Sequence, residues 1–254
     1  MAGKGKVIIL TGASRGIGLA IAQYLLKQQC NLIVTARTQG ALEKLSDEYP
    51  GQVECLVGDM ADMSTGPKAV ELAKSKFKTL DGLVINHGVL EPMERIATGD
   101  VQEWRKAFDI NYFSAVSLAQ AALPALRASK GRVIFVSSGA ATDAYATWGA
   151  YGSSKAAMNH LNMTLAVEEP DVTFVSIRPG TVDTAMQVKL RGDYNSKMDK
   201  KDAEHFANLP NNGKLLRTDQ PGNVIAKLVI DAPKDLSGQF LAWNDTEVLA
   251  KYQE

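Results

Sequence analysis

Short apolar runs alternate with longer amphipathic stretches along the whole chain. The runs are rich in Val, Ile and Leu, and they predict strands at 7–10, 31–36, 53–57, 82–86, 132–137, 173–179 and 239–243. Because these runs are continuously apolar, they are typical of strands that are covered on both faces, which indicates a parallel sheet.

The stretches between the runs carry apolar residues at helical spacing. They predict helices near 17–29, 39–48, 66–78, 101–128, 150–168 and 220–231. Strict alternation of strand and helix implies right-handed crossovers, and therefore an α/β fold of the Rossmann type with helices on both faces of a doubly wound parallel sheet. We expect residues 1–254 to form a single domain, since no linker rich in Pro, Gly or Ser interrupts the pattern.

Residues 185–217 depart from this alternation. The stretch is highly charged and contains no strand-like run. A long insertion after a sheet strand often serves as a lid or a substrate-binding segment, and we expect a substrate lid here. A solvated surface loop would have the same composition.

Charge and composition exclude several classes of partner. The 254 residues include 28 Lys and Arg and 28 Asp and Glu, so the net charge is zero. The chain therefore lacks the excess of positive charge that is typical of proteins that bind nucleic acid or an anionic membrane. No segment approaches the roughly 18 apolar residues of a membrane span, and the first apolar run is too short for a signal peptide. Cys30 and Cys55 are expected to be buried free thiols in a cytoplasmic protein.

The stretch TGASRGIG, at 11–18, lies where the first strand should turn into the first helix. A helix N-terminus at this place offers free N–H groups and the positive end of the peptide dipole to a pyrophosphate. Gly12 would permit the tight turn, Gly16 would let the backbone approach a phosphate, and Gly18 would let helix and strand pack closely. The spacing differs from the common G-x-G-x-x-G, so a purely structural turn is the alternative.

Two arginines indicate which nucleotide would bind. The second strand ends at Ala36-Arg37-Thr38, where enzymes that prefer NAD usually carry Asp or Glu for the ribose hydroxyl. A guanidinium instead binds a 2′-phosphate through charge-assisted hydrogen bonds, and Arg15 can reach the same region. The pair favours NADP(H), although both could be solvated surface cations.

Tyr151 and Lys155 are four residues apart and share one face of a predicted helix. A nearby ammonium lowers the pKa of a phenol from its usual value of about 10, so that the tyrosine can exchange a proton with a carbonyl oxygen. Ser138 follows the predicted strand 132–137, at the edge where ligands bind in such sheets. Its hydroxyl could hydrogen-bond a substrate carbonyl, or it could be an ordinary turn residue.

In their order and spacing these motifs resemble the short-chain dehydrogenase/reductase family. Further matching pieces are Gly58-Asp59, Asn86-His87-Gly88, Asn111 in DINYFS and the stretch RPGTVDT at 178–184. The family usually has Asn-Ala-Gly where this chain has Asn86-His87-Gly88. A histidine there could tune cofactor affinity, and an accommodated substitution without chemistry is the simpler interpretation.

The resemblance implies roles for four residues. Tyr151 would be the catalytic acid and base, and Lys155 would lower its pKa and bind the nicotinamide ribose. Ser138 would orient the substrate carbonyl, and Asn111 would hold a water that links Lys155 to solvent. Other implied cofactor contacts are Ser14, Ile17, Asp59, Met60, Asn86, Gly88, Pro179, Gly180, Val182 and Thr184. The spacing of His, Cys and Asp predicts no catalytic metal.

The C-terminal half resembles the sepiapterin-reductase-like and benzil-reductase-like branch of the family, particularly its fungal members. That branch implies NADPH-dependent reduction of a small-molecule ketone, such as a vicinal diketone. We expect Met93, Tyr145, Trp148 and Met186 to line the substrate pocket. Alternatives are an oxidative secondary-alcohol dehydrogenase and a non-catalytic NADP-sensing protein. The resemblance also implies a homodimer or homotetramer that associates through the predicted helices 101–128 and 150–168.

Overall fold

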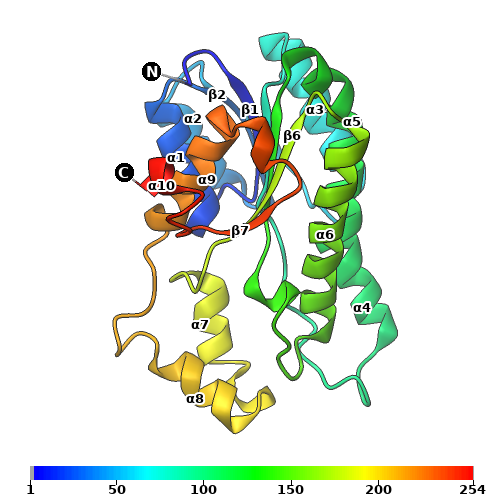
Figure 1. Cartoon of the computed structure of the whole chain (residues 1–254), viewed down its shortest axis with the longest axis vertical. Helices are drawn as coiled ribbons and strands as arrows, with labels where there is room; N and C mark the ends of the chain where they lie inside the picture. Colours follow the sequence, from blue (N-terminus) through cyan, green and yellow to red (C-terminus); the bar gives the residue numbers. More distant parts are fainter. Residues whose placement is uncertain (1–2, 254) are drawn as a thin grey trace.

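Seven parallel strands form one sheet in the computed structural model, which describes residues 3–253 (Figure 1). The strand order is β3-β2-β1-β4-β5-β6-β7. The strands are β1 (Val7–Thr11), β2 (Asn31–Ala36), β3 (Val53–Val57), β4 (Gly82–Ile85), β5 (Arg132–Val136), β6 (Thr173–Arg178) and β7 (Phe240–Ala242). The chain order reverses between β1 and β4, and ligands bind at such a switch point in doubly wound sheets. The predicted fold class is confirmed.

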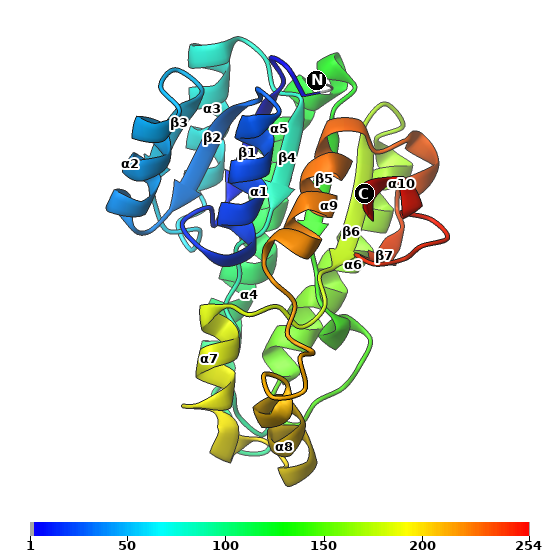
Figure 2. The ribbon, with the colours of Figure 1, turned by 90° about the vertical axis from the view of Figure 1, so that its left-hand side faces the viewer.

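Helices cover both faces of the sheet (Figures 1 and 2). Helices α1, α2 and α9 pack on one face, whereas α3, α5 and α6 pack on the other. The helices are α1 (Gly16–Lys27), α2 (Gln39–Glu48), α3 (Thr65–Phe77), α4 (Val101–Phe108), α5 (Ser114–Ser129), α6 (Gly149–Glu168), α7 (Ala185–Arg191), α8 (Lys200–Asn208), α9 (Asp219–Asp231) and α10 (Ala250–Gln253).

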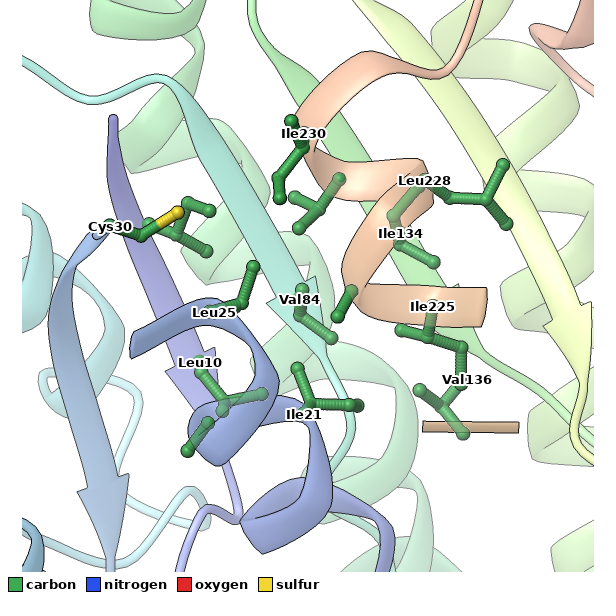
Figure 3. Packing of buried hydrophobic residues seen from close by; sticks show 14 of the residues in the cluster. Leu10, Ile21, Leu25, Cys30, Val84, Ile134, Val136, Ile225, Leu228 and Ile230 are labelled. Carbon is green, nitrogen blue, oxygen red and sulfur yellow. The ribbon is translucent and has the colours of Figure 1, made fainter. Parts of the chain in front are cut away.

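The apolar strands supply two cores because successive side chains point to opposite faces. In β1, Ile8 and Leu10 pack toward α1 and α9, while Val7 and Ile9 pack toward the other helices. Figure 3 shows the first core, where side chains from α1 and α9 meet those of the central strands. The sheet is therefore packed against helices on both faces.

The helix predicted over 101–128 is interrupted, so that prediction was wrong in its continuity. Helix α4 ends at Phe108 and α5 begins at Ser114, and a π-helical turn, Asp109–Phe113, lies between them. We call this segment the π turn. Its wider winding changes the direction in which the residue at its centre, Asn111, projects, and π-helical turns of this kind are frequent at functional sites.

Residues 185–217 form a small lobe beyond the carboxyl edge of the sheet (Figures 1 and 2). The lobe contains α7 and α8, which the charged composition did not predict. Glu91, which follows β4, ties the lobe to the sheet by accepting hydrogen bonds from Lys189 Nζ (3.1 Å) and Tyr194 OH (2.7 Å). Asp199 makes a further ion pair with Arg95.

Two sequence expectations concern the whole chain. Cys30 and Cys55 are free, as predicted; Cys30 is buried and Cys55 is half-buried. Over residues 3–253, the helices are all too short or too polar to cross a lipid bilayer.

Candidate active site

A cavity of about 640 Å³ opens at the carboxyl edge of the sheet. Its lining comes from the β1–α1 turn, from the segments that follow β2 to β7, and from the lobe. All the residues predicted to bind the cofactor border it: Gly12, Ser14, Arg15, Gly16, Ile17, Gly18, Arg37, Asp59, Met60, Asn86, Gly88, Tyr151, Lys155, Pro179, Gly180, Val182 and Thr184. The fold therefore brings residues from distant parts of the sequence to one site.

The glycine turn is held tightly against its neighbours. Gly12 and Gly16 have positive φ values of 68° and 57°, a region that favours glycine. A methyl group at Gly18 would collide with the Gly12 carbonyl oxygen, and one at Gly16 would lie 3.2 Å from Thr184 Cγ2. Asn86 Nδ2 donates to the carbonyl oxygens of Thr11 (3.0 Å) and Gly12 (3.2 Å), so this amide fixes the turn.

The start of α1 fits a phosphate group. Within residues 3–253, no side chain caps the N-terminus of this helix and no acidic residue lies in its first turn. Its first residues, Gly16, Ile17 and Gly18, border the cavity, so its free N–H groups are available to an anion there. Arg15 and Arg37 are both exposed at the cavity rim. In the described part of the chain neither arginine forms an ion pair, which leaves both guanidinium groups available to an anion.

Ser138, Tyr151 and Lys155 meet at the floor of the cavity. The Ser138 side chain lies beside the Tyr151 phenol and lowers its pKa, and Lys155 Nζ lies 5.8 Å from the centre of the Tyr151 ring. Lys155 is buried and donates a hydrogen bond to the Val136 carbonyl oxygen (2.9 Å). A substrate oxygen placed beside the phenol would therefore have a proton donor and a second hydroxyl within reach.

The pKa of Tyr151 is shifted in the opposite direction from the one expected. Burial raises the pKa of the phenol, and the neighbouring Ser138 hydroxyl only opposes that rise. Burial also lowers the pKa of Lys155 to about 8, because desolvation disfavours its ammonium form. The buried phenol is thus held in its protonated form at neutral pH.

Asn111 does not line the cavity, although it was expected to act in the catalytic set. Its Oδ1 accepts from Val89 N (2.8 Å), and its Nδ2 donates to Val89 O (2.9 Å) and to Ser154 Oγ (3.1 Å). This buried amide therefore binds both the N–H and the carbonyl group of Val89, the residue after Gly88. Its implied role in holding a water beside Lys155 stays a prediction.

An aromatic cluster forms the other end of the cavity. The rings of Trp148 and Phe206 are stacked with centroids 5.4 Å apart, and the Tyr145 ring lies 4.9 Å from that of Trp148. Tyr145, Trp148 and Met186 line the cavity as predicted. Met93 does not, because it is buried in the apolar cluster behind the cavity wall.

Phe206 was missed at the sequence level. It lies in α8 of the charged lobe, yet it is only 5% exposed and packs against Tyr145 and Trp148. The one large apolar side chain in KKDAEHFAN was the available signal. Over residues 3–253, no group of three His, Cys, Asp or Glu side chains is arranged to hold a metal ion.

Comparison with known proteins agrees with this geometry. A family model described as short chain dehydrogenase matches residues 6–195. The uncharacterized oxidoreductase YIR035C of Saccharomyces cerevisiae is 42% identical over 245 residues, which cover 95% of this chain and 96% of that protein. Its crystal structure superposes with a TM-score of 0.95 at 41% identity, covering 98% of this chain and 100% of that one. The benzil reductase ((S)-benzoin forming) IRC24 of the same yeast is 41% identical over 254 residues, covering 95% and 97% of the two chains.

Proposed function

The chain belongs to the short-chain dehydrogenase family, and we propose that it is an NADPH-dependent reductase of ketones that carry apolar or aromatic groups. The observation that carries the proposal is that Ser138, Tyr151 and the buried Lys155 meet in one cavity, with Lys155 Nζ 5.8 Å from the centre of the Tyr151 ring. These residues border the same cavity as the glycine turn on one side and the aromatic cluster on the other.

The residues present fit a dinucleotide. The uncapped N-terminus of α1 would hold the pyrophosphate, while Arg15 and Arg37 would bind the 2′-phosphate. Lys155 would bind the nicotinamide ribose, and Thr184, whose methyl group faces Gly16, would close over the nucleotide. When bound, the reduced nicotinamide supplies the hydride for the carbonyl carbon.

Tyr151 and Ser138 would handle the proton. Ser138 would hydrogen-bond the ketone oxygen and orient it toward the phenol. Tyr151 would then give its proton to that oxygen as negative charge develops there, which completes the alcohol. A phenol whose pKa is raised by burial stays protonated at neutral pH, and this is the form that the reductive direction requires.

The aromatic cluster supports the substrate class. The rings of Tyr145, Trp148 and Phe206 pack together, and Trp148 also contacts the Tyr151 ring edge-on. An aryl group of a ketone would pack against this cluster. The similarity to a benzil reductase favours vicinal diketones among such substrates.

A panel of ketones, diketones and secondary alcohols, assayed with NADPH, NADH and their oxidised forms, tests the proposal. We expect the best kcat/KM for an aryl diketone with NADPH. Tyr151→Phe should lower kcat by about 10²- to 10⁴-fold, the usual contribution of general acid catalysis, while NADPH binding stays within about threefold. Tyr145→Phe makes the same change in the same cavity and should keep kcat within about tenfold, because Tyr145 lies before α6 and the residue four positions on is Gly149, not a lysine.

Each alternative function has its own result in this panel. Tight NADPH binding without turnover of any carbonyl or alcohol would identify a nucleotide sensor. Turnover of alcohols alone would identify an oxidative dehydrogenase. Full activity of the Tyr151→Phe variant would contradict the assignment of the proton donor.

Self-association is also proposed. Phe113, Met163 and Val167 are exposed apolar residues of the π turn and α6, and these segments belong to the two helical regions through which the family resemblance implies a homodimer or homotetramer. Light scattering of the intact chain should give twice or four times the monomer mass. A monomer at micromolar concentration would contradict this expectation.

A further inference from the structure

His87 makes more specific contacts than an accommodated substitution needs. Its Nδ1 lies 2.7 Å from Thr11 Oγ1, at the end of β1. Its Nε2 lies 3.0 Å from the Ile110 carbonyl oxygen and 2.7 Å from Ser114 Oγ, both in or beside the π turn. The ring therefore bridges the strand edge that carries the glycine turn and the helical turn that carries Asn111.

The neighbouring groups determine which ring nitrogen carries the proton. The Ile110 carbonyl can only accept, and the Ser114 hydroxyl already donates to that same carbonyl (2.6 Å). Nε2 must therefore be the donor to both oxygens. The Thr11 hydroxyl oxygen accepts from the backbone N–H groups of Asn86 (3.0 Å) and His87 (3.3 Å). Its own hydrogen has two possible acceptors, Nδ1 at 2.7 Å and the Val84 carbonyl oxygen at 3.3 Å, and the shorter distance favours Nδ1.

The resulting imidazole is neutral, with hydrogen on Nε2 only. A second ring proton would direct an N–H at the Thr11 oxygen, which already receives two. Burial and the Lys155 ammonium from α6 also lower the pKa of His87, to about 4, while the Asp59 carboxylate after β3 opposes this shift. His87 is therefore a fixed bridge at neutral pH and not a titrating group.

The bridge lies in the segment that forms the cavity floor. Asn86 fixes the glycine turn, His87 fixes the π turn, and the main chain of Val89 is gripped by Asn111. Gly88 lies between them, and a Cβ atom added to it would be 3.4 Å from Lys155 Nζ and 3.3 Å from Asn111 Oδ1. Any shift of the π turn would move this segment against the lysine.

We propose that His87 is a positioning residue that holds the π turn in register with the strand edge, and thereby places Asn111, Gly88 and Lys155 for catalysis. The effect on turnover rests on the proposed reductase function. The structural bridge does not, since it consists of contacts within the chain.

The two ends of the bridge can be separated by amide substitutions. In His87→Gln, the side-chain amide N–H takes the place of Nε2–H and keeps a donor toward Ile110 and Ser114. In His87→Asn, the shorter amide places its oxygen near the Nδ1 position and keeps only the acceptor toward Thr11. His87→Ala removes both ends, and His160→Ala, an exposed histidine on α6, is the matched control.

Three measurements on the full chain test the proposal. We expect kcat with NADPH and an aryl diketone to fall about three- to tenfold in the Ala and Asn variants, the cost of a typical buried hydrogen bond, with the KM for NADPH within about twofold. The Gln variant and the His160 control should keep wild-type kcat. Amide hydrogen exchange at residues 110–114 should be faster in the Ala and Asn variants only, and ¹⁵N NMR should show the neutral Nε2–H form of His87.

Contrary results would be clear. Unchanged exchange of the π turn in His87→Ala, or NMR evidence that Nδ1 carries the proton, would overturn the bridge. Equal loss of kcat in the Gln and Ala variants would overturn its assignment to the π-turn end. If the wild-type chain reduces no carbonyl, the proposed function fails, while exchange and NMR still decide the role of His87.

Discussion

Arg15 and Arg37 should determine the choice between the two nicotinamide nucleotides. Both guanidinium groups border the cavity beside the N-terminus of α1, and both are exposed. NADPH differs from NADH only by the 2′-phosphate, so a group that binds this phosphate affects one nucleotide and not the other. We expect Arg15→Ala, Arg37→Ala and the double variant to weaken NADPH selectively.

The magnitude follows from the exposure of the two side chains. A hydrogen bond to a charged group contributes about 1.5–3 kcal/mol, and solvent screening places exposed arginines near the lower end. About 1.4 kcal/mol corresponds to tenfold, so each single variant should lose about tenfold in kcat/KM for NADPH. Two groups on one phosphate are coupled, and the double variant should lose about 30- to 100-fold.

The assay compares kcat/KM for NADPH and NADH in each variant with the same ketone at fixed ionic strength. Arg105→Ala removes the same charge from an exposed position on α4 and is the matched control. NADH values should stay within about twofold throughout. An equal loss for both nucleotides, or a wild-type enzyme that prefers NADH, would refute the reasoning from the arginines.

Three further predictions concern stability and the substrate end. Gly18→Ala should lower the free energy of unfolding in urea by at least ~1–3 kcal/mol and abolish nucleotide binding, because the added methyl group would collide with the Gly12 carbonyl oxygen. Gly40→Ala in α2 is the control, since a methyl group there would contact no other atom and should raise the free energy of unfolding by ~0.5–1 kcal/mol. Phe206→Ala should raise the KM for an aryl ketone about tenfold without changing NADPH affinity in titrations, since the ring packs only at the lobe end; unchanged KM would exclude the aromatic wall. His87 takes up a proton below about pH 6.5 in the unfolded chain, but only near pH 4 in the folded chain. As the pH falls from 6.5 to 4, the free energy of unfolding of the wild type should therefore fall by up to ~3 kcal/mol more than that of His87→Gln.

The sheet could be predicted because its strands are read from local composition. Every predicted strand is present, since continuous Val, Ile and Leu runs need burial on both faces and only a parallel sheet provides it. The helix break at 109–113 could not be predicted. FDINYFSAVSL keeps an unbroken helical pattern, and the π turn is stabilised by His87 and Val89, which lie more than 20 residues away in sequence.

The chemistry of the site was predicted in part. Tyr151, Lys155 and Ser138 meet because their spacing is local to α6 and the end of β5, and the glycine turn is a local motif. The direction of the Tyr151 pKa depends on burial, which the lobe supplies from a distant part of the sequence. For the same reason Met93 was placed on the cavity wall and Phe206 was overlooked: their burial is decided by tertiary packing.

The segment 86–91 constrains how this enzyme can change. Each contact of this segment goes to a different part of the fold. Asn86 binds the glycine turn and His87 binds the π turn. Val89 binds Asn111, and Glu91 binds the lobe. Inserting or deleting one residue there would put all four contacts out of phase at once. Libraries that aim to alter the substrate range should therefore keep this length and vary the lobe, where the turn near Gly213 has open space around it.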